Sequence, residues 1–231
     1  KFGFNFVFFL VAIPAFLNAL QTTTWVQIKE HDGETGQKVT RAFLREAFTS
    51  LKKKPSLLRI MVNVLLYSSV FVALGTFVQP YMTEAGLPLA YFGFVYSGVL
   101  LIVAFLTRFS ATLEGRFGGR TVMNALTLVS ILPLLILGLG YTSFIGVSLF
   151  FFVLMVQNFR SPIANSIFHE EVDSKNRATM GSLLSLFQNS GNLILLPFMG
   201  YLADIYSIYT AILVLAGIVA LTSTLLWVKK A

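Results

Sequence analysis

The chain has 231 residues, of which 56% are hydrophobic and 14% are aromatic but only 12% are charged. Soluble domains carry about 25% charged residues, so this composition excludes a soluble enzyme and a disordered tail. The absence of cysteine excludes a secreted scaffold held together by disulfides. The net charge of +7 would be compatible with nucleic-acid binding, but the distribution of the basic residues indicates a membrane protein instead.

Seven stretches of the sequence are long enough and apolar enough to cross a bilayer. A spanning helix needs about 20 apolar residues, and the centres of these stretches lack acidic and basic residues. Continuous apolar runs in lipid must be helical, because only a helix satisfies its own backbone. The predicted spans are 4–28, 60–83, 87–107, 121–140, 143–168, 178–203 and 208–228. We therefore expect an all-α membrane protein with seven transmembrane helices in the lipid bilayer.

The basic residues fall in alternate connectors between these spans. The connector 29–59 holds eight of them, whereas the connectors near Glu84, Tyr141 and Asp204 hold none. Of the other basic residues, Lys1 starts the chain and Arg160 lies near the inner edge of the fifth span, and the rest follow the third, fifth and last spans. Because positive loops stay in the cytoplasm, the pattern predicts an N-terminus outside and a C-terminus in the cytoplasm. It explains the basic charge without nucleic-acid binding.

The first connector, residues 29–56, contains a short amphipathic segment. Apolar residues recur in it at helical spacing, with basic residues elsewhere around the turn, up to Pro55. This pattern predicts a helix on the inner membrane surface; a solvated basic loop is the alternative. The chain begins with Lys1 rather than Met, and its apolar start is longer than the h-region of a signal peptide. We expect residue 1 to be cut from a longer chain with further helices before it.

Polar side chains concentrate in the second, fifth and sixth spans. Amides in hydrocarbon are costly unless they face water or one another, so these residues predict a binding cavity, with interhelical hydrogen bonding as the alternative. The candidate substrate-binding residues are Asn63, Tyr67, Gln79, Gln157, Asn158, Gln188, Asn189 and Asn192. Arg160 lies near the inner edge of its span, where snorkelling to the interface is the simplest interpretation and binding of an anionic substrate the other. Small-residue pairs such as Gly93 with Ser97 predict close helix packing.

No catalytic or metal-binding constellation occurs in the sequence. The two histidines, His31 and His169, have no partner motif, and the acidic residues after His169 lack metal-ligand spacing. No nucleotide-binding loop is present. We therefore expect a protein without enzyme activity, metal or cofactor.

Two connectors resemble the major facilitator superfamily of transporters. Residues 111–120 resemble the family's G-x-L-x-D-R-x-G-R-R loop, and 176–182 with 197–204 resemble its R-A-T-x-x-S and P-x-x-G-x-L-x-D run. The matching or substituting positions of these motifs are Glu114, Arg116, Gly118, Arg120 and Arg177, together with Leu113.

The resemblance implies helices six to twelve of a bacterial transporter in the inner membrane. Residues 1–28 would be the last helix of an N-terminal bundle, 29–56 a cytoplasmic linker, and 57–231 the six-helix C-terminal bundle. The partner would be the missing N-terminal bundle, and the substrate a small molecule moved by alternating access. A seven-helix receptor or photoreceptor is the alternative, although 208–228 lacks the lysine that retinal needs. The aromatic and amide content slightly favours efflux over permeation by a small polar metabolite.

Overall fold

The computed structural model describes residue 16, residues 54–172 and residues 177–228, without the side chains of 178 and 179. The expected span 4–28 and the amphipathic linker therefore lie outside the described residues, apart from helical Phe16 and the residues 54–56. The described residues contain helices and no strand, which confirms the all-α class. The helices between Pro55 and Leu225 belong to one compact unit.

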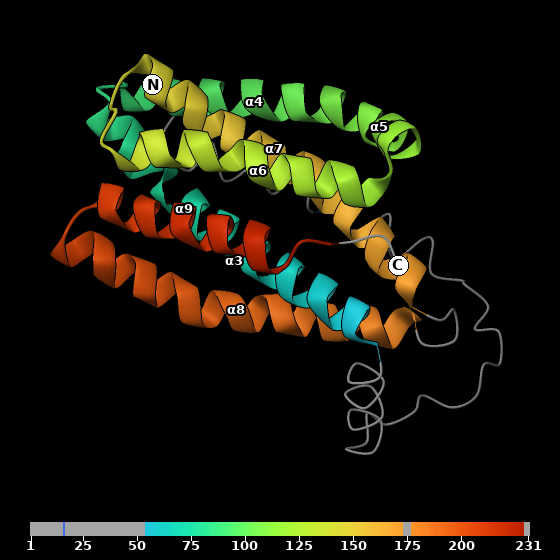
Figure 1. Cartoon of the computed structure of the whole chain (residues 1–231). Helices are drawn as coiled ribbons and strands as arrows, with labels where there is room; N and C mark the ends of the chain where they lie inside the picture. The colour runs from blue at the N-terminus through green and yellow to red at the C-terminus, as the bar shows by residue number, and fades with distance from the viewer. Residues whose placement is uncertain (1–15, 17–53, 173–176, 229–231) are drawn as a thin grey trace. The chain divides into compact units, whose positions relative to one another are not determined.

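Six long helical segments follow one another along this unit (Figure 1). One of them is interrupted, because η1 (Leu89–Tyr91), α4, η2 (Thr107–Phe109) and α5 form nearly continuous helix over 89–117. The α-helices are α3 (Pro55–Glu84), α4 (Phe92–Leu106), α5 (Ser110–Phe117), α6 (Gly119–Gly138), α7 (Phe144–Glu171), α8 (Arg177–Ile205) and α9 (Ile208–Leu225).

Five of these segments have the length and apolar composition of membrane spans, namely Pro55–Glu84, Leu89–Phe117, Gly119–Gly138, Phe144–Glu171 and Ile208–Leu225. They coincide with five of the predicted spans. Helix α8 has 29 residues, which at 1.5 Å per residue is long enough to cross a bilayer. It is not among the five, because Gln188, Asn189 and Asn192 interrupt its apolar sequence. The sixth predicted span is thus a helix of unusual polarity.

The ends of two predicted spans differ from the helices observed. Helix α3 begins at Pro55, where the fixed φ of proline suits the first helical position, five residues before the expected start. The connector expected at 111–120 is helical as far as Phe117. The break comes at Gly118, whose φ of 80° belongs to the left-handed region that glycine adopts readily. Arg108 ends the apolar run of the predicted span but does not end the helix.

The helices alternate in direction, so their charged ends meet as the charge pattern predicts. We call the end where α3, α6 and α8 begin, and where α7 and α9 end, the basic end (Figure 1). In the part of the chain that the structure describes, every Lys and Arg except Arg160 lies there: Lys54, Arg59, Arg108, Arg116, Arg120 and Arg177. Glu84 and Asp204 lie at the opposite end. The relative sidedness of the connectors is therefore consistent with the sequence; which side is cytoplasmic stays a prediction.

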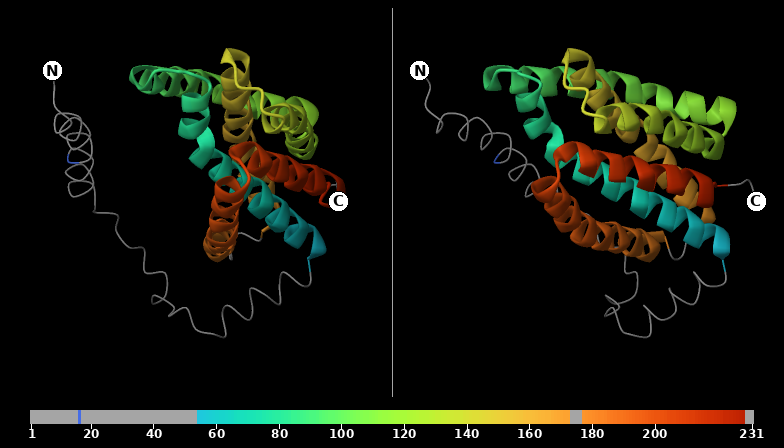
Figure 2. Two further views of the ribbon diagram at one scale, coloured as in Figure 1. Left: turned by 90° about the vertical axis from the view of Figure 1, so that its left-hand side faces the viewer. Right: turned by 60° about the vertical axis from the view of Figure 1, so that its left-hand side comes forward.

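Helix α3 runs through the middle of the unit and packs against α7, α8 and α9. Helices α4 and α8 lie on opposite sides of it (Figure 2). Two apolar clusters fill the interior. One contains Tyr81, Phe150 and Leu215 toward the end opposite the basic end, and the other contains Ile60, Ile167 and Val228 toward the basic end.

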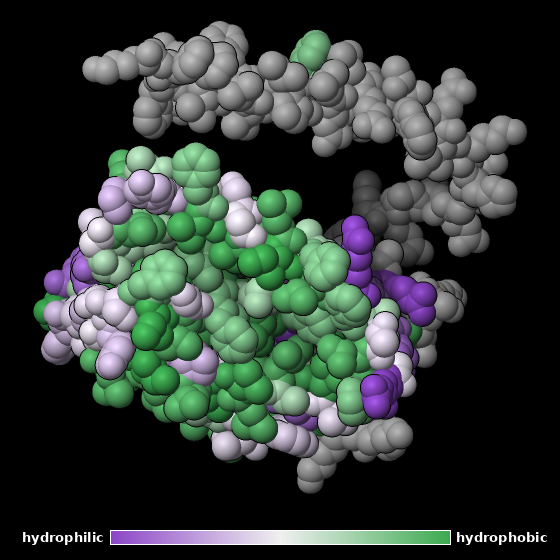
Figure 3. Space-filling model, turned by 90° about the horizontal axis from the view of Figure 1, so that it is seen from above, coloured by the Kyte–Doolittle hydropathy of each residue, from purple (hydrophilic) through white to green (hydrophobic). Residues whose placement is uncertain are grey.

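Much of the surface is apolar, as expected for helices in lipid or against further protein. In the space-filling view of Figure 3, apolar residues cover most of the face and the most hydrophilic residues lie at its margins. The segment Leu89–Phe117 is the extreme case, with 6% of its most apolar stretch buried. Such a surface cannot face water over this length, which supports an integral membrane protein.

Candidate functional site

A polar layer around Arg160 separates the two apolar clusters. Arg160 lies on α7 and is 1% exposed. Its Nε donates to Thr127 Oγ1 of α6 at 3.0 Å, and a terminal nitrogen donates to Asn63 Oδ1 of α3. The guanidinium carbon lies 3.8 Å from the centre of the Tyr67 ring, within the range of a cation–π contact. The interpretation that Arg160 snorkels to the interface is wrong, because α3 and α6 cover the side chain.

Asn63 and Tyr67 are brought together at this layer, and protein groups satisfy their polar atoms. Asn63 is 1% and Tyr67 0% exposed. Asn63 Nδ2 donates to the carbonyl oxygen of Leu226 at 3.1 Å, while its Oδ1 accepts from Arg160. The hydroxyl groups of Tyr67 and Ser130 are 2.6 Å apart, and Ser130 Oγ donates to the Leu126 carbonyl at 2.8 Å, so Tyr67 is the donor to Ser130.

The charge of Arg160 is met by neutral dipoles. Its acceptors are an amide and a hydroxyl oxygen, and Asn63 links it to the carbonyl that follows the last turn of α9. The C-terminal end of a helix carries partial negative charge. This arrangement lowers the cost of a buried cation, which is large when the charge is left unpaired.

A second amide fixes the segment that follows α9. Asn124 Nδ2 donates to the Val228 carbonyl at 3.0 Å, and Asn124 Oδ1 accepts from the Val228 backbone at 3.4 Å. Asn124, Thr127 and Ser130 are not among the residues predicted from the sequence. Their spacing of three residues, which puts polar groups along one face of a helix, was the available signal.

The other predicted binding residues lie at separate positions on α3, α7 and α8. Asn158 is exposed, and its Nδ2 donates to the Leu154 carbonyl at 2.9 Å. Gln79 and Asn189 are exposed and Gln188 is partly exposed. Gln157 Oε1 and Asn192 Oδ1 are buried without a hydrogen-bond partner among the described residues. Only Asn63 and Tyr67 of the eight thus share the contacts around Arg160.

The residues of the loop motif lie around the start of α6. Gly118 makes the break between α5 and α6. A Cβ at Gly119 would lie 2.9 Å from Glu114 Oε1, so the Glu114 carboxylate sits beside the first residue of α6, where the helix dipole favours negative charge. Arg116 lies over the Phe117 ring, 5.4 Å from its centre, and exposed Arg177 is the first residue of α8.

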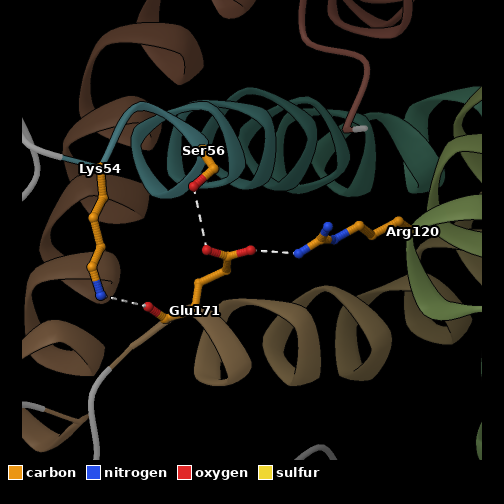
Figure 4. Close-up of polar contacts among 4 residues, drawn as sticks. All are labelled: Lys54, Ser56, Arg120 and Glu171. Atoms are coloured by element: carbon orange, nitrogen blue, oxygen red, sulfur yellow. Dashed lines mark hydrogen bonds and ion pairs between the residues drawn. The ribbon is translucent and has the colours of Figure 1, made fainter. Parts of the chain in front are cut away.

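Glu171 connects three helices at the basic end. It forms an ion pair with Arg120 of α6, and its other carboxylate oxygen accepts from Ser56 Oγ of α3 at 3.3 Å (Figure 4). Lys54 Nζ donates to the Glu171 backbone carbonyl at 3.5 Å (Figure 4). The last turn of α7 is thereby joined to the first turns of α3 and α6.

An apolar pocket of about 370 Å³ lies between α4 and α7, in the half away from the basic end. Apolar side chains line it, with one hydroxyl among them: Leu87, Val95, Val99, Ile102, Phe144, Val147, Ser148, Phe151, Phe152 and Met155. The described residues contain no group of three acidic or histidine side chains that could hold a metal ion.

The model of the Major Facilitator Superfamily matches residues 1–158 and 93–231, which together cover the whole chain. The chain belongs to this family of membrane transporters, and the observed bundle of long apolar helices agrees with it. The resemblance seen in the two connector motifs is therefore confirmed, and nothing supports the receptor alternative. No curated protein and no solved structure matches the chain significantly.

Proposed function

We propose that residues 57–231 are the C-terminal six-helix bundle of a secondary transporter that moves a small molecule by alternating access. The observation that carries this proposal is the family match over the whole chain. The alternating direction of the helices and their shared basic end agree with a membrane bundle of this kind. Such transporters work by rocking one bundle against another around a midplane site. Residues 1–28 would then close an N-terminal bundle, and 29–56 would link the two.

We further propose that the bundle lies in a bacterial inner membrane, with its basic end facing the cytoplasm. The support is the collection of Lys and Arg at one end of the described helices, as the positive-inside rule requires. ATP does not drive transport directly in this proposal.

Polar side chains that are exposed or lack a partner in mid-helix are the candidate substrate contacts. Asn158 and Asn189 are exposed near the middles of α7 and α8, and Gln157 and Asn192 hold unpaired oxygens. A polar group in that position is costly in lipid, so a water-filled cavity or a partner bundle must cover it. Asn63 and Tyr67 act instead through Arg160, which they hold in place.

Solute counterflow in proteoliposomes tests the proposal. The full transporter chain is reconstituted without ATP and loaded with each of two panels: neutral amphipathic antibiotics, chloramphenicol among them, and sugars with amino acids. We expect saturable exchange of a compound from either panel. If the transporter works in efflux, we expect that compound to come from the amphipathic panel. Folded protein that exchanges nothing from a broadened panel would contradict the proposal. Residues 1–231 alone should give no exchange, because one complete bundle cannot alternate.

A further inference from the structure

The apolar pocket between α4 and α7 has a buried floor and an exposed rim. Val147 and Phe151 are each 6% exposed and form the floor. The Phe151 ring meets the Tyr96 ring edge-on, with centres 5.4 Å apart, so α4 and α7 hold this floor from both sides. Ile102 and Phe144 on the rim are more than half exposed. A molecule can therefore enter the pocket without unfolding either helix.

The lining of the pocket selects an apolar occupant. Water needs two to four polar partners to stay in a cavity, and the one hydroxyl in the lining, Ser148 Oγ, already donates to the Phe144 carbonyl at 3.0 Å. An empty space loses the dispersion contacts of its walls. The volume of about 370 Å³ lies at the small end of the range for small-molecule pockets, roughly 300–1,000 Å³.

The face of α7 that lines the pocket also carries a polar side chain, nearer the middle of the helix. Residues three and four apart lie side by side on a helix, so Asn158 follows Met155 on the face that also carries Phe151. Because Asn158 Nδ2 is bonded to the Leu154 carbonyl, the exposed side chain has its oxygen available as an acceptor. Neither the lining nor Asn158 carries a charge.

We propose that this pocket binds the apolar portion of a neutral amphipathic substrate, whose hydrogen-bond donor meets the side-chain oxygen of Asn158. The inference rests on the proposed transport function and names the substrate class that this half of the protein recognises. An apolar body fits the pocket between α4 and α7, and a hydroxyl or amide group lies one helical turn further along α7. A charged substrate would find no counter-charge among these residues.

Photolabelling tests the proposal without knowledge of the natural substrate. The full chain in lipid nanodiscs is irradiated with 3-azioctanol, a neutral photoactivatable alcohol, and labelled residues are mapped by mass spectrometry. We expect saturable labelling concentrated on the pocket residues of α4 and α7. Val99→Phe fills the pocket and should lower this labelling about tenfold, as expected for a misfit in an apolar pocket. Val129→Phe, on the exposed face of α6, is the matched control and should leave it unchanged.

A second probe distinguishes a substrate from a membrane lipid. Phosphatidylcholine with a diazirine on its acyl chain should label exposed faces of several helices without concentrating in the pocket. Saturable lipid labelling there, undiminished by 3-azioctanol, would overturn the proposal in favour of a lipid site. Uniform labelling by 3-azioctanol that Val99→Phe does not change would also overturn it. If counterflow persists in that case, transport stands and the pocket assignment alone fails; pocket labelling without any counterflow would instead count against transport.

The proposed hydrogen bond between the substrate and Asn158 can be tested separately from the apolar pocket. Asn158→Leu removes the acceptor, so protection of the pocket from 3-azioctanol by excess 1-octanol should weaken, while protection by n-octane stays the same. Equal weakening for both competitors, or for neither, would contradict a role for the Asn158 oxygen.

Discussion

Asn63 joins the buried guanidinium of Arg160 to the C-terminal end of α9. Its Oδ1 accepts from Arg160, and its Nδ2 donates to the Leu226 carbonyl at 3.1 Å. One side chain thus satisfies a cation on α7 and a free carbonyl beyond α9 while itself belonging to α3. Because both bonds use different atoms of the same amide, the orientation of Asn63 is determined by its partners.

Asn63→Ala should destabilise the bundle by about 1.5–3 kcal/mol, the usual range for a hydrogen bond to a charged group. This exceeds the roughly 0.6 kcal/mol of an average intramembrane hydrogen bond, because Arg160 would keep its charge with one acceptor fewer. Unfolding in a detergent series, followed by fluorescence-detected size exclusion, measures the loss. Asn189→Ala, at an exposed position of α8, is the control and should change stability little. Equal effects of the two substitutions would contradict the role given to Asn63.

Gly146→Ala should destabilise the bundle by about 1–3 kcal/mol, the range for overpacking. A Cβ there would lie 2.1 Å from the Tyr141 carbonyl oxygen and 2.3 Å from the Tyr81 hydroxyl, and a backbone atom cannot move aside cheaply. Gly217→Ala is the matched control, since a Cβ at Gly217 would meet no atom of the described part of the chain within 4 Å. It should raise stability slightly through the higher helix propensity of alanine. A thermal-shift measurement that ranks both variants alike would argue against this packing.

The ion pair between Arg120 and Glu171 should contribute up to about 1 kcal/mol to stability. Both side chains are partly exposed, 21% and 17%, so solvent and salt screen the interaction. The variants R120Q, E171Q and the double substitution form a cycle whose coupling energy isolates the pair. We expect a favourable coupling that falls as salt concentration rises. A coupling of zero at low salt would show that the pair does not link α6 and α7.

Cysteines at positions 112 and 142 should react from opposite sides of the membrane. Thr112 lies on α5 at the basic end and Thr142 in the connector at the other end, and both are exposed. The chain has no native cysteine, so single substitutions report without background. An impermeant maleimide should label position 142 in intact cells and position 112 only in inverted vesicles. Labelling of both from one side would exclude the alternating arrangement.

The spans with continuous apolar sequence could be predicted closely from the sequence, as the agreement of 121–140 with Gly119–Gly138 illustrates. Length and apolarity alone determine such a helix in lipid. The end of α5 could not, because Arg108 ends the apolar run at residue 107 whereas the backbone ends the helix at Gly118. Hydropathy and hydrogen bonding set these two boundaries separately.

The polar site could be predicted in part. Polarity inside apolar spans selected Asn63 and Tyr67, but it could not show that both face Arg160, because that depends on how α3 and α7 are rotated against each other. Depth along the span suggested that Arg160 reaches the interface, whereas α3 and α6 bury it. Packing also determines which small residues lie at close contacts between helices. Gly93 was expected at a close helix contact, but among the described residues a Cβ there would meet nothing within 4 Å. Approaches under 3.0 Å would arise instead at Gly119, Gly138, Gly146 and Gly191.

The pocket between α4 and α7 leaves no signature in the sequence. Its lining consists of Val, Ile, Leu, Phe and Met residues with one Ser, the same types that fill the cores of both apolar clusters. Whether such side chains close against one another or leave a space is a property of tertiary packing.

Alternating access is the central claim, and the accessibility of one mid-membrane residue tests it most directly. Asn189 is exposed near the middle of α8, and Asn189→Cys supplies the one thiol within residues 1–231; any cysteine elsewhere in the full transporter chain is first replaced by serine. The account predicts that an impermeant thiol reagent reaches this cysteine from the cytoplasmic side in one state and from the outside in another, with a saturating transported compound shifting the balance. Labelling from one side only under every condition, in folded protein, would contradict it.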